Sequence, residues 1–288
     1  MVDPTIAESD AALARRLAVL AGELLLRVRA THGHADPAAL KAAGDRASHD
    51  FLRAELARWR PADAVLSEED EGSRLVDGGD GVSRRTADRV WIIDPLDGTR
   101  EFSEQGRTDW AVHVALWARD AATPHGLIAG AVGLPAQHRV LATDVAAAPP
   151  ATPTPPGTAL RLAASRSRPP AFLADLADEV GAELVPMGSA GAKIAAVVTG
   201  DVDAYIHAGG QYEWDSAAPV AVATAAGLHA SRIDGSPLTY NEADPRLPDL
   251  LVCRDELAAP LLAALRRQLA GTAVPSGSPA PHPGKDPR

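Results

Sequence analysis

Residues 91–99 read WIIDPLDGT, and the rest of the chain can be interpreted outward from this stretch. Its apolar run is typical of a buried strand, and it leads directly into two aspartates three positions apart. A turn at Pro95 can bring the carboxylates of Asp94 and Asp97 and the main-chain carbonyl of Leu96 to one point. Hard cations such as Mg²⁺ prefer this set of oxygen ligands. The stretch therefore predicts a strand that ends at a divalent-metal site.

The two residues after the aspartates suit a bound phosphate. Gly98 permits a close backbone approach or a positive φ. Thr99 lies where a helix could begin, and there it offers a hydroxyl and free N–H groups to an anion. The same residues also fit an ordinary surface turn, because Pro-x-Asp-Gly is common in turns. The stretch alone leaves both interpretations open.

Two further acidic clusters stand at the ends of apolar elements. SEEDE at 67–71 follows a short apolar run, although such a run is also typical of a solvated surface. EWDS at 213–216 precedes a helical stretch, where Asp215 would also serve as the N-cap, with Pro219 in the first turn. If the clusters converge, they form a site for two metal ions. Its ligands would be Glu68, Asp94, the Leu96 carbonyl, Asp97 and Asp215.

The first half of the chain mixes helices and strands in an α+β pattern. Apolar residues at helical spacing predict a helix over about 8–30. A second helix is predicted from near Asp45 to an inward-facing Trp59, before Pro61 stops it. Segment 110–117 alternates apolar residues on one face and predicts a half-buried strand. Further strands are predicted at 64–66, 90–93, 126–133 and 137–143.

The second half alternates strands and helices. A Pro-rich loop at 147–157 precedes it, and the Pro, Gly and Ser content of 271–288 predicts a disordered tail. We therefore expect an α/β protein with an α+β domain at 1–146, which carries most metal ligands. An α/β domain at 158–270 completes the site and binds substrate. In this second domain, strands are predicted at 160–164, 182–187 and 203–207, and helices from 169–170, over 190–199 and after Asp215.

Composition excludes several classes of protein. The 288 residues are 46% hydrophobic and 23% charged, as in an ordinary globular protein. A formal net charge of −10 argues against an overall basic footprint for polymeric nucleic acid. The single cysteine, Cys253, fits a reducing cytoplasm. No apolar run approaches the roughly 18 residues of a membrane span, and the acidic N-terminus is unlike a signal peptide. We expect a cytoplasmic protein without a membrane partner.

In order, the motifs EE (68–69), WIIDPLDGT (91–99) and WD (214–215) resemble the inositol monophosphatase superfamily of Mg²⁺-dependent, lithium-sensitive phosphomonoesterases. The resemblance covers about residues 8–270. DGTREF at 97–102 is similar to the DGT[KR]EF form of the CysQ-type 3′(2′),5′-bisphosphate nucleotidases, and the stretches GSAGAK at 188–193 and GDVDAY at 200–205 also resemble that branch. The resemblance implies the layered α-β-α-β-α sandwich of the inositol monophosphatase and fructose-1,6-bisphosphatase type.

The resemblance also implies a role for each matching residue. Two or three Mg²⁺ ions would bind the ligand set given above, with Asp94 as a bridge between them. Asp45 would pair with Thr99 to orient the attacking water, and Glu69 would hold a metal-bound water. For Asp45, a carboxylate at the start of a helix, favoured by the helix dipole, is the plain alternative.

Substrate binding is implied for a partly overlapping set of residues. A second phosphate needs its own cation, for which Arg100, Lys193, Arg166 and Arg168 are candidates. The related nucleotidases often carry a Ser-His pair where this chain has SRSR at 165–168, and an arginine there could stack on a base or hold a phosphate. The implied substrate-binding residues are Glu68, Leu96, Asp97, Gly98, Thr99, Arg100, Ser189, Lys193 and Asp215.

The implied activity is Mg²⁺-dependent hydrolysis of adenosine 3′,5′-bisphosphate (PAP) to AMP and phosphate. Its phosphosulfate (PAPS) would be a second substrate, and sulfate assimilation the setting. Two alternatives stay open, which are an inositol-phosphate or fructose-1,6-bisphosphate phosphatase on the same scaffold and a non-catalytic regulator that binds metal or nucleotide. The partner would be a small phosphorylated metabolite, and homodimers are usual in the superfamily.

Several conspicuous residues have structural interpretations. We expect His49 on a helix surface and His113 in a sheet, because hard Mg²⁺ prefers oxygen ligands to nitrogen. Cys253 is expected to be a small buried residue. The expected role of Trp59, Trp110 and Trp117 is packing in the core or at an interface.

Overall fold

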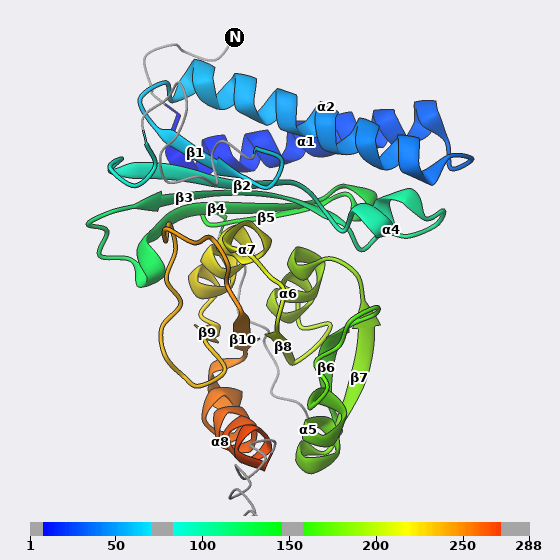
Figure 1. Ribbon diagram of the computed structural model, residues 1–288, viewed down its shortest axis with the longest axis vertical. Helices are drawn as coiled ribbons and strands as arrows, with labels where there is room; N and C mark the ends of the chain where they lie inside the picture. The colour runs from blue at the N-terminus through cyan, green and yellow to red at the C-terminus, as the bar shows by residue number, and fades with distance from the viewer. Residues whose placement is uncertain (1–7, 71–82, 146–157, 272–288) are drawn as a thin grey trace, which may run out of the picture.

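The computed structural model describes residues 8–70, 83–145 and 158–271. The predicted loop at 147–157 and, beyond Gly271, the predicted tail lie outside these residues. Along the described chain, two five-stranded sheets alternate with pairs of helices (Figure 1). The layers run helices, sheet, helices, sheet, helices, so the predicted α-β-α-β-α sandwich is confirmed.

The first sheet carries the WIIDPLDGT stretch near its edge. β1 lies parallel to β2, and β2, β3, β4 and β5 follow as antiparallel neighbours in sequence order. This sheet confirms the strands predicted in the first half of the chain. Its strands are β1 (Ala64–Ser67), β2 (Arg89–Asp97), β3 (Ala111–Ala118), β4 (Leu127–Leu134) and β5 (Arg139–Ala142).

The second sheet has the order β7-β6-β8-β10-β9, in which β6 is parallel to β7 and β8, and β10 is antiparallel to β8 and β9. It confirms the strands predicted in the second half. Its strands are β6 (Leu160–Ser165), β7 (Ala182–Met187), β8 (Ala204–Ala208), β9 (His229–Ser231) and β10 (Asp249–Cys253).

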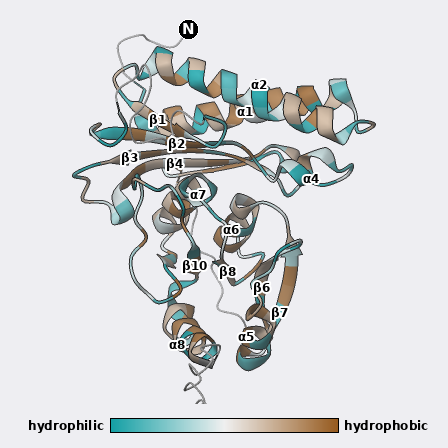
Figure 2. Ribbon diagram, viewed as in Figure 1, coloured by the Kyte–Doolittle hydropathy of each residue, from teal (hydrophilic) through white to brown (hydrophobic). Residues whose placement is uncertain are grey.

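Helices fill the three remaining layers. Those of the first pair cover the outer face of the first sheet, and in Figure 2 hydrophilic and hydrophobic residues alternate along them, as expected of helices with one buried face. The second pair packs between the sheets, and the third covers the outer face of the second sheet. The pairs are α1 (Asp10–His32) with α2 (Pro37–Trp59), α6 (Ala190–Val198) with α7 (Glu213–Ala225), and α5 (Leu173–Val180) with α8 (Asp255–Gly271). Short helices are α4 (Thr99–Ser103) and the 3₁₀ turns η1 (Pro124–Gly126) and η2 (Pro135–Gln137).

Strand β3 is more deeply buried than its pattern predicts. Val112, Val114 and Leu116 face the cluster under α1 and α2, as the alternation indicates. Ala111 and Ala115 on the opposite face are also fully buried, because α6 and α7 cover that side. The alternation was right, and the expectation of a half-buried strand was wrong.

Helix α2 begins earlier than predicted. Asp36 caps it by accepting hydrogen bonds from the N–H groups of Ala38 and Ala39, and Pro37 occupies the first turn. Asp45 therefore lies in the interior of the helix, and its interpretation as a helix-start carboxylate was wrong. Trp59 was also predicted wrongly, because it is 42% exposed at the end of the helix. Arg16 and Arg58 lie over its ring.

Helix α7 also begins earlier than predicted. Its first residue is Glu213, so Asp215 lies at the third position and is not the N-cap. There its carboxylate accepts a hydrogen bond from the N–H of Tyr212 at 2.7 Å. Pro219 was expected in the first turn, but it lies farther along, in the interior of the helix. Helix α5 begins at Leu173, a few residues after the predicted Pro169–Pro170 start. Among the described residues, no helix is long and apolar enough to cross a membrane.

Candidate active site

The site is built where β2 leaves the first sheet. The pairing of β2 with β3 shifts register between Asp94 and Asp97, so the strand bulges at the proline. The N–H of Leu96 donates to the Asp94 carboxylate at 3.0 Å, and the Ser48 hydroxyl of α2 donates to the Pro95 carbonyl at 2.7 Å. Gly98 follows with a φ of +83°, a conformation that favours glycine, and α4 begins at the next residue. These contacts fix the turn between the two aspartates.

Asp97 is held by the start of helix α6. One of its oxygens, Oδ2, accepts hydrogen bonds from the Ser189 hydroxyl at 2.6 Å and from the Gly191 N–H at 2.7 Å. The same serine caps α6 by accepting from the Ala192 N–H. The positive end of the helix dipole thus faces the carboxylate. A residue of the first sheet is in this way fixed by an element of the second half of the chain.

The predicted metal and substrate residues converge on one cavity of about 460 Å³. Its lining includes Arg166 and Arg168 but neither Asp45, which is half-buried, nor Glu69, which is exposed. Every residue predicted to bind metal or substrate lines the cavity: Glu68, Asp94, Leu96, Asp97, Gly98, Thr99, Arg100, Ser189, Lys193 and Asp215.

The acidic end of the cavity has the electrostatics of a cation site. Burial raises the pKa of Asp94 well above its ordinary value, and the neighbouring carboxylates of Glu68 and Asp97 raise it further. Burial and Asp97 do the same to the pKa of Asp215. Oxygen donors that repel one another when ionised fit a divalent cation, because its charge offsets both the repulsion and the burial. The donor set therefore suits a metal ion.

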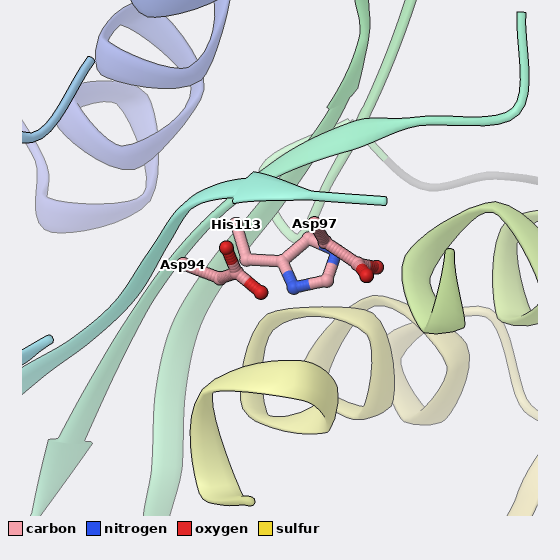
Figure 3. A group of neighbouring side chains, drawn as sticks. All are labelled: Asp94, Asp97 and His113. Atoms are coloured by element: carbon pink, nitrogen blue, oxygen red, sulfur yellow. The ribbon is translucent and has the colours of Figure 1, made fainter. Parts of the chain in front are cut away.

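A histidine that the sequence analysis set aside also lies in this cluster. Asp94, Asp97 and His113 each offer a ligand atom within 4.8 Å of the others (Figure 3). His113 is the cross-strand neighbour of Asp94, and its Nε2 lies 3.3 Å from Oδ2 of Asp97. The prediction of a sheet histidine was right. The alternation of β3, with Val112 and Val114 facing the other way, could have placed His113 on the face of the site.

The predicted pair of Thr99 and Asp45 is not formed among the described residues. The Thr99 hydroxyl instead donates to the Leu96 carbonyl at 3.1 Å. Asp45 reaches the neighbourhood because Gly44 lets α2 pack directly against Leu96 and Phe102. Burial, followed by the charges of Glu69 and Glu68, raises the pKa of Asp45 to about 7.

The cavity lining also carries cations, and Lys193 lies close enough to Asp97 and Asp215 to interact with their charges. The Lys193 ammonium is buried and donates to the carbonyls of Gly188 (3.1 Å) and Ser189 (2.7 Å), and burial lowers its pKa. Arg166 extends from the end of β6 to α4, where it pairs with Glu101 at 2.8 Å and Glu104 at 2.9 Å. The cavity lining therefore combines carboxylates with cations.

Other lining residues were not predicted. They come from β7, β8 and the loop before α7, and apart from Tyr205, which ends the GDVDAY stretch, their apolar or loop context gave no signal in the sequence. They include Met187, Tyr205, His207, Gly209, Gly210 and Gln211.

The remaining singled-out residues are structural. His49 contacts the Ser67 hydroxyl through Nδ1 at 3.2 Å. Cys253 is fully buried, as expected of a small core residue. Trp110 is fully buried, with its ring edge-on to Phe102, and Trp117 packs partly buried against the core. The packing roles expected of Cys253, Trp110 and Trp117 are thus confirmed.

Comparison with known proteins adds three findings. The sequence model described as the inositol monophosphatase family matches residues 6–270. A Mycobacterium leprae protein named 3′-phosphoadenosine 5′-phosphate phosphatase is 52% identical over 266 residues, covering 90% of this chain and 94% of that protein. The 3′(2′),5′-bisphosphate nucleotidase CysQ of Escherichia coli K12 is 30% identical over 209 residues, covering 69% of this chain and 78% of that protein.

A solved structure shares the fold. The crystal structure of CysQ from Bacteroides thetaiotaomicron, described as a bacterial member of the inositol monophosphatase family, superposes with a TM-score of 0.68. It is 26% identical, and the match covers 86% of this chain and 97% of that one. The sequence match and the architecture therefore agree with one family.

Proposed function

Because the chain belongs to the inositol monophosphatase family, we propose that it hydrolyses PAP to AMP and inorganic phosphate in a Mg²⁺-dependent reaction. The observation that carries the proposal is one cavity whose lining combines buried carboxylates with Lys193, Arg166 and Arg168. A bisphosphate offers one phosphate to metal ions on the carboxylates and a second phosphate to the cations. The named activity of the 52% identical relative supports the same substrate.

In this proposal two or three Mg²⁺ ions bind at the carboxylate end. Bound Mg²⁺ would neutralise the phosphate oxygens and make a water molecule nucleophilic. The chain supplies the oxygen donors, and the helices behind them hold those donors in place through Ser189 and through the N–H of Tyr212. The proposed ligands are Glu68, Asp94, the Leu96 carbonyl, Asp97 and Asp215.

The chain also supplies groups that can orient water and accept its proton. Asp45, with its pKa near 7, can hold or release a proton around neutral pH. The proposal requires Thr99 to exchange the Leu96 carbonyl for Asp45, which is a change of side-chain rotamer. Glu69, exposed beside them, is proposed to hold a water in the outer part of the site. The hydrolysis itself breaks the ester P–O bond, with the water oxygen joining phosphorus.

In this proposal the cations of the cavity lining bind the second phosphate of the substrate. Lys193 is already desolvated there, so a phosphate gains a strong charge-assisted contact at little further cost of dehydration. Arg166 is paired with Glu101 and Glu104, so Arg168 and Arg100 are the arginines of the lining that a second phosphate can reach without displacing those glutamates. The start of α4 at Gly98 and Thr99 is proposed to receive the phosphate that is cleaved.

The setting is also part of the proposal. PAP is the product left when PAPS transfers its sulfate, so the enzyme would act in sulfate assimilation, with PAPS as a second substrate. We place it in the cytoplasm, on the single buried Cys253, and expect it to act on a small metabolite as a homodimer. Sedimentation of the purified protein at twice the chain mass would support the dimer, and sedimentation at the chain mass would exclude it.

A comparison of substrates tests the function. Phosphate release is measured with Mg²⁺ from PAP, PAPS, inositol 1-phosphate and fructose 1,6-bisphosphate. We expect PAP to have a kcat/KM at least about 100-fold above those of inositol 1-phosphate and fructose 1,6-bisphosphate, because neither of these two has phosphates at the spacing of a nucleotide. If inositol 1-phosphate or fructose 1,6-bisphosphate is the best substrate, the proposed phosphatase activity stands but the proposed nucleotide substrate is wrong. Metal binding without any turnover would favour a regulator.

A further inference from the structure

His113 lies at the point where the three elements that carry or hold the proposed metal ligands meet. It projects from β3 and contacts Oδ2 of Asp97 on β2, with Nε2 at 3.3 Å. Its Nδ1 lies 3.0 Å from the carbonyl of Trp214, in the first turn of α7 and directly before Asp215. The side chain is fully buried, and it is not needed by the proposed chemistry.

The hydrogen-bond pattern assigns the tautomer of the neutral ring. A carbonyl only accepts, so Nδ1 carries the proton and donates it to Trp214. Nε2 then has no hydrogen-bond partner among the described residues, although it is buried and aimed at Asp97. A buried polar atom left in this way is uncommon and calls for an explanation.

The first turn of α6 closes around the same ring. A β-carbon added to Gly191 would lie 1.9 Å from Nε2 of His113, so the helix approaches the imidazole as closely as a glycine permits. The N–H of Gly191 meanwhile donates to the same Asp97 oxygen that faces the ring. The start of α6 therefore holds Asp97 by a hydrogen bond, whereas the imidazole, with no proton on Nε2, limits its position by packing.

We propose that His113 is a positioning residue for the metal site. By spanning from Asp97 to the carbonyl before Asp215, and by packing against Gly191, it sets the spacing of the two aspartates that must share the cations. The inference rests on the proposed metal site and adds a residue to it. Loss of such an outer partner typically weakens metal binding by 10- to 100-fold.

The test measures Mn²⁺ binding directly, from the electron paramagnetic resonance signal of the free ion, and therefore does not depend on turnover. We expect His113→Ala to bind Mn²⁺ at least about tenfold more weakly than the native enzyme. Val114→Ala is the matched control, because Val114 is equally buried on the same strand but faces the α1 and α2 side. It should lower the melting temperature without changing the affinity. His113→Asn, whose amide nitrogen takes the place of Nδ1, should recover part of the loss.

Gly191→Ala supplies an independent variant. Its methyl group pushes the imidazole away from Asp97, so it should weaken Mn²⁺ binding in the native background. In the His113→Ala background it should have little further effect, because the clash is gone. Equal losses in both backgrounds, or native affinity in His113→Ala, would overturn the inference. Absence of Mn²⁺ binding by the native enzyme would instead overturn the proposed metal site.

Discussion

Asp94 is a buried carboxylate surrounded by other carboxylates. It lies 1% exposed at the end of β2, with Glu68, Asp97 and Asp215 as charged neighbours. Without a cation this arrangement is costly, because burial and repulsion both oppose ionisation. Its place near the end of a buried strand is therefore explained by the proposed metal binding and not by stability.

The variant Asp94→Asn separates the effect of Asp94 on activity from its effect on stability. We expect kcat for PAP to fall by at least about 100-fold, because a charged group at the reacting centre is lost. The metal-free variant should melt at the same temperature as the native protein or higher, since the neutral amide can still accept from the Leu96 N–H. Phosphate release and melting in the presence of a chelator check both. A variant that is inactive because it is unfolded would contradict this interpretation.

Lys193 is predicted to contribute to the affinity for PAP. Lys193→Met keeps the length of the side chain and its packing on Tyr205 but removes the charge. We expect KM for PAP to rise at least about tenfold, as for the loss of a charged hydrogen bond to phosphate. The KM for inositol 1-phosphate, which lacks a second phosphate, should change less. An equal rise for both substrates would mean that Lys193 does not bind the second phosphate.

At the scale of elements, the start of α6 is both a helix cap and a clamp on Asp97. Ser189 has a φ of +47°, which is strained for a residue with a side chain. Its hydroxyl both donates to Asp97 and accepts from the Ala192 N–H. The strained backbone therefore occurs at a residue whose hydroxyl both caps α6 and holds Asp97.

Replacing Ser189 by alanine and by glycine separates its contribution to stability from its contribution to Mg²⁺ activation. Ser189→Ala should lose about 1 kcal/mol of stability through the cap. Ser189→Gly should lose less, because glycine adopts a positive φ without strain. Both should weaken Mg²⁺ activation of PAP hydrolysis to a similar degree, since both lack the hydroxyl that holds Asp97. Urea unfolding and Mg²⁺ titration of activity give the two measurements, and normal Mg²⁺ activation in either variant would refute the clamp.

Sequence patterns predicted the elements well where the signal was local. The strand predicted at 90–93 and the helix after residue 189 follow from apolar runs and their polar ends, although β2 continues to Asp97. The start of α2 was predicted too late, although Asp36 and Pro37 are an ordinary cap and first-turn pair. Trp59 was placed in the core because a helical pattern does not show where the covering layer stops. Burial of both faces of β3 depends on α7, about a hundred residues away.

At the scale of the whole molecule, the site forms because α6 and α7 are packed between the two sheets. That packing brings Ser189 and Asp215 to the end of β2, although they are distant in the chain. Spacing alone could not predict this convergence, and the role of these residues was inferred from resemblance. His113 was set aside because its importance lies in contacts with α6 and α7, which no local pattern shows.

The acidic cluster also predicts how stability depends on pH. Asp45, like Glu213, has its pKa raised to about 7, so the folded protein binds protons more tightly than the unfolded chain between about pH 4 and 7. Stability without metal should therefore fall as the pH rises through this range, and ionisation of Asp94 and Asp215 acts in the same direction. Mg²⁺ should raise the melting temperature more at about pH 8 than at about pH 5.5. Calorimetry with and without a chelator measures this, and a larger Mg²⁺ effect in acid would be inconsistent with it.

The most direct test of the account is a crystal structure of the enzyme with Mn²⁺, AMP and phosphate, with the ions located by their anomalous scattering. We predict ions bound by Asp94, Asp97 and Asp215 and the freed phosphate at the start of α4. The phosphate of AMP should lie beside Lys193 and Arg168 in the same cavity. Ions bound away from the three aspartates, or a nucleotide outside this cavity, would contradict the central claim that the end of β2 is the hydrolytic site.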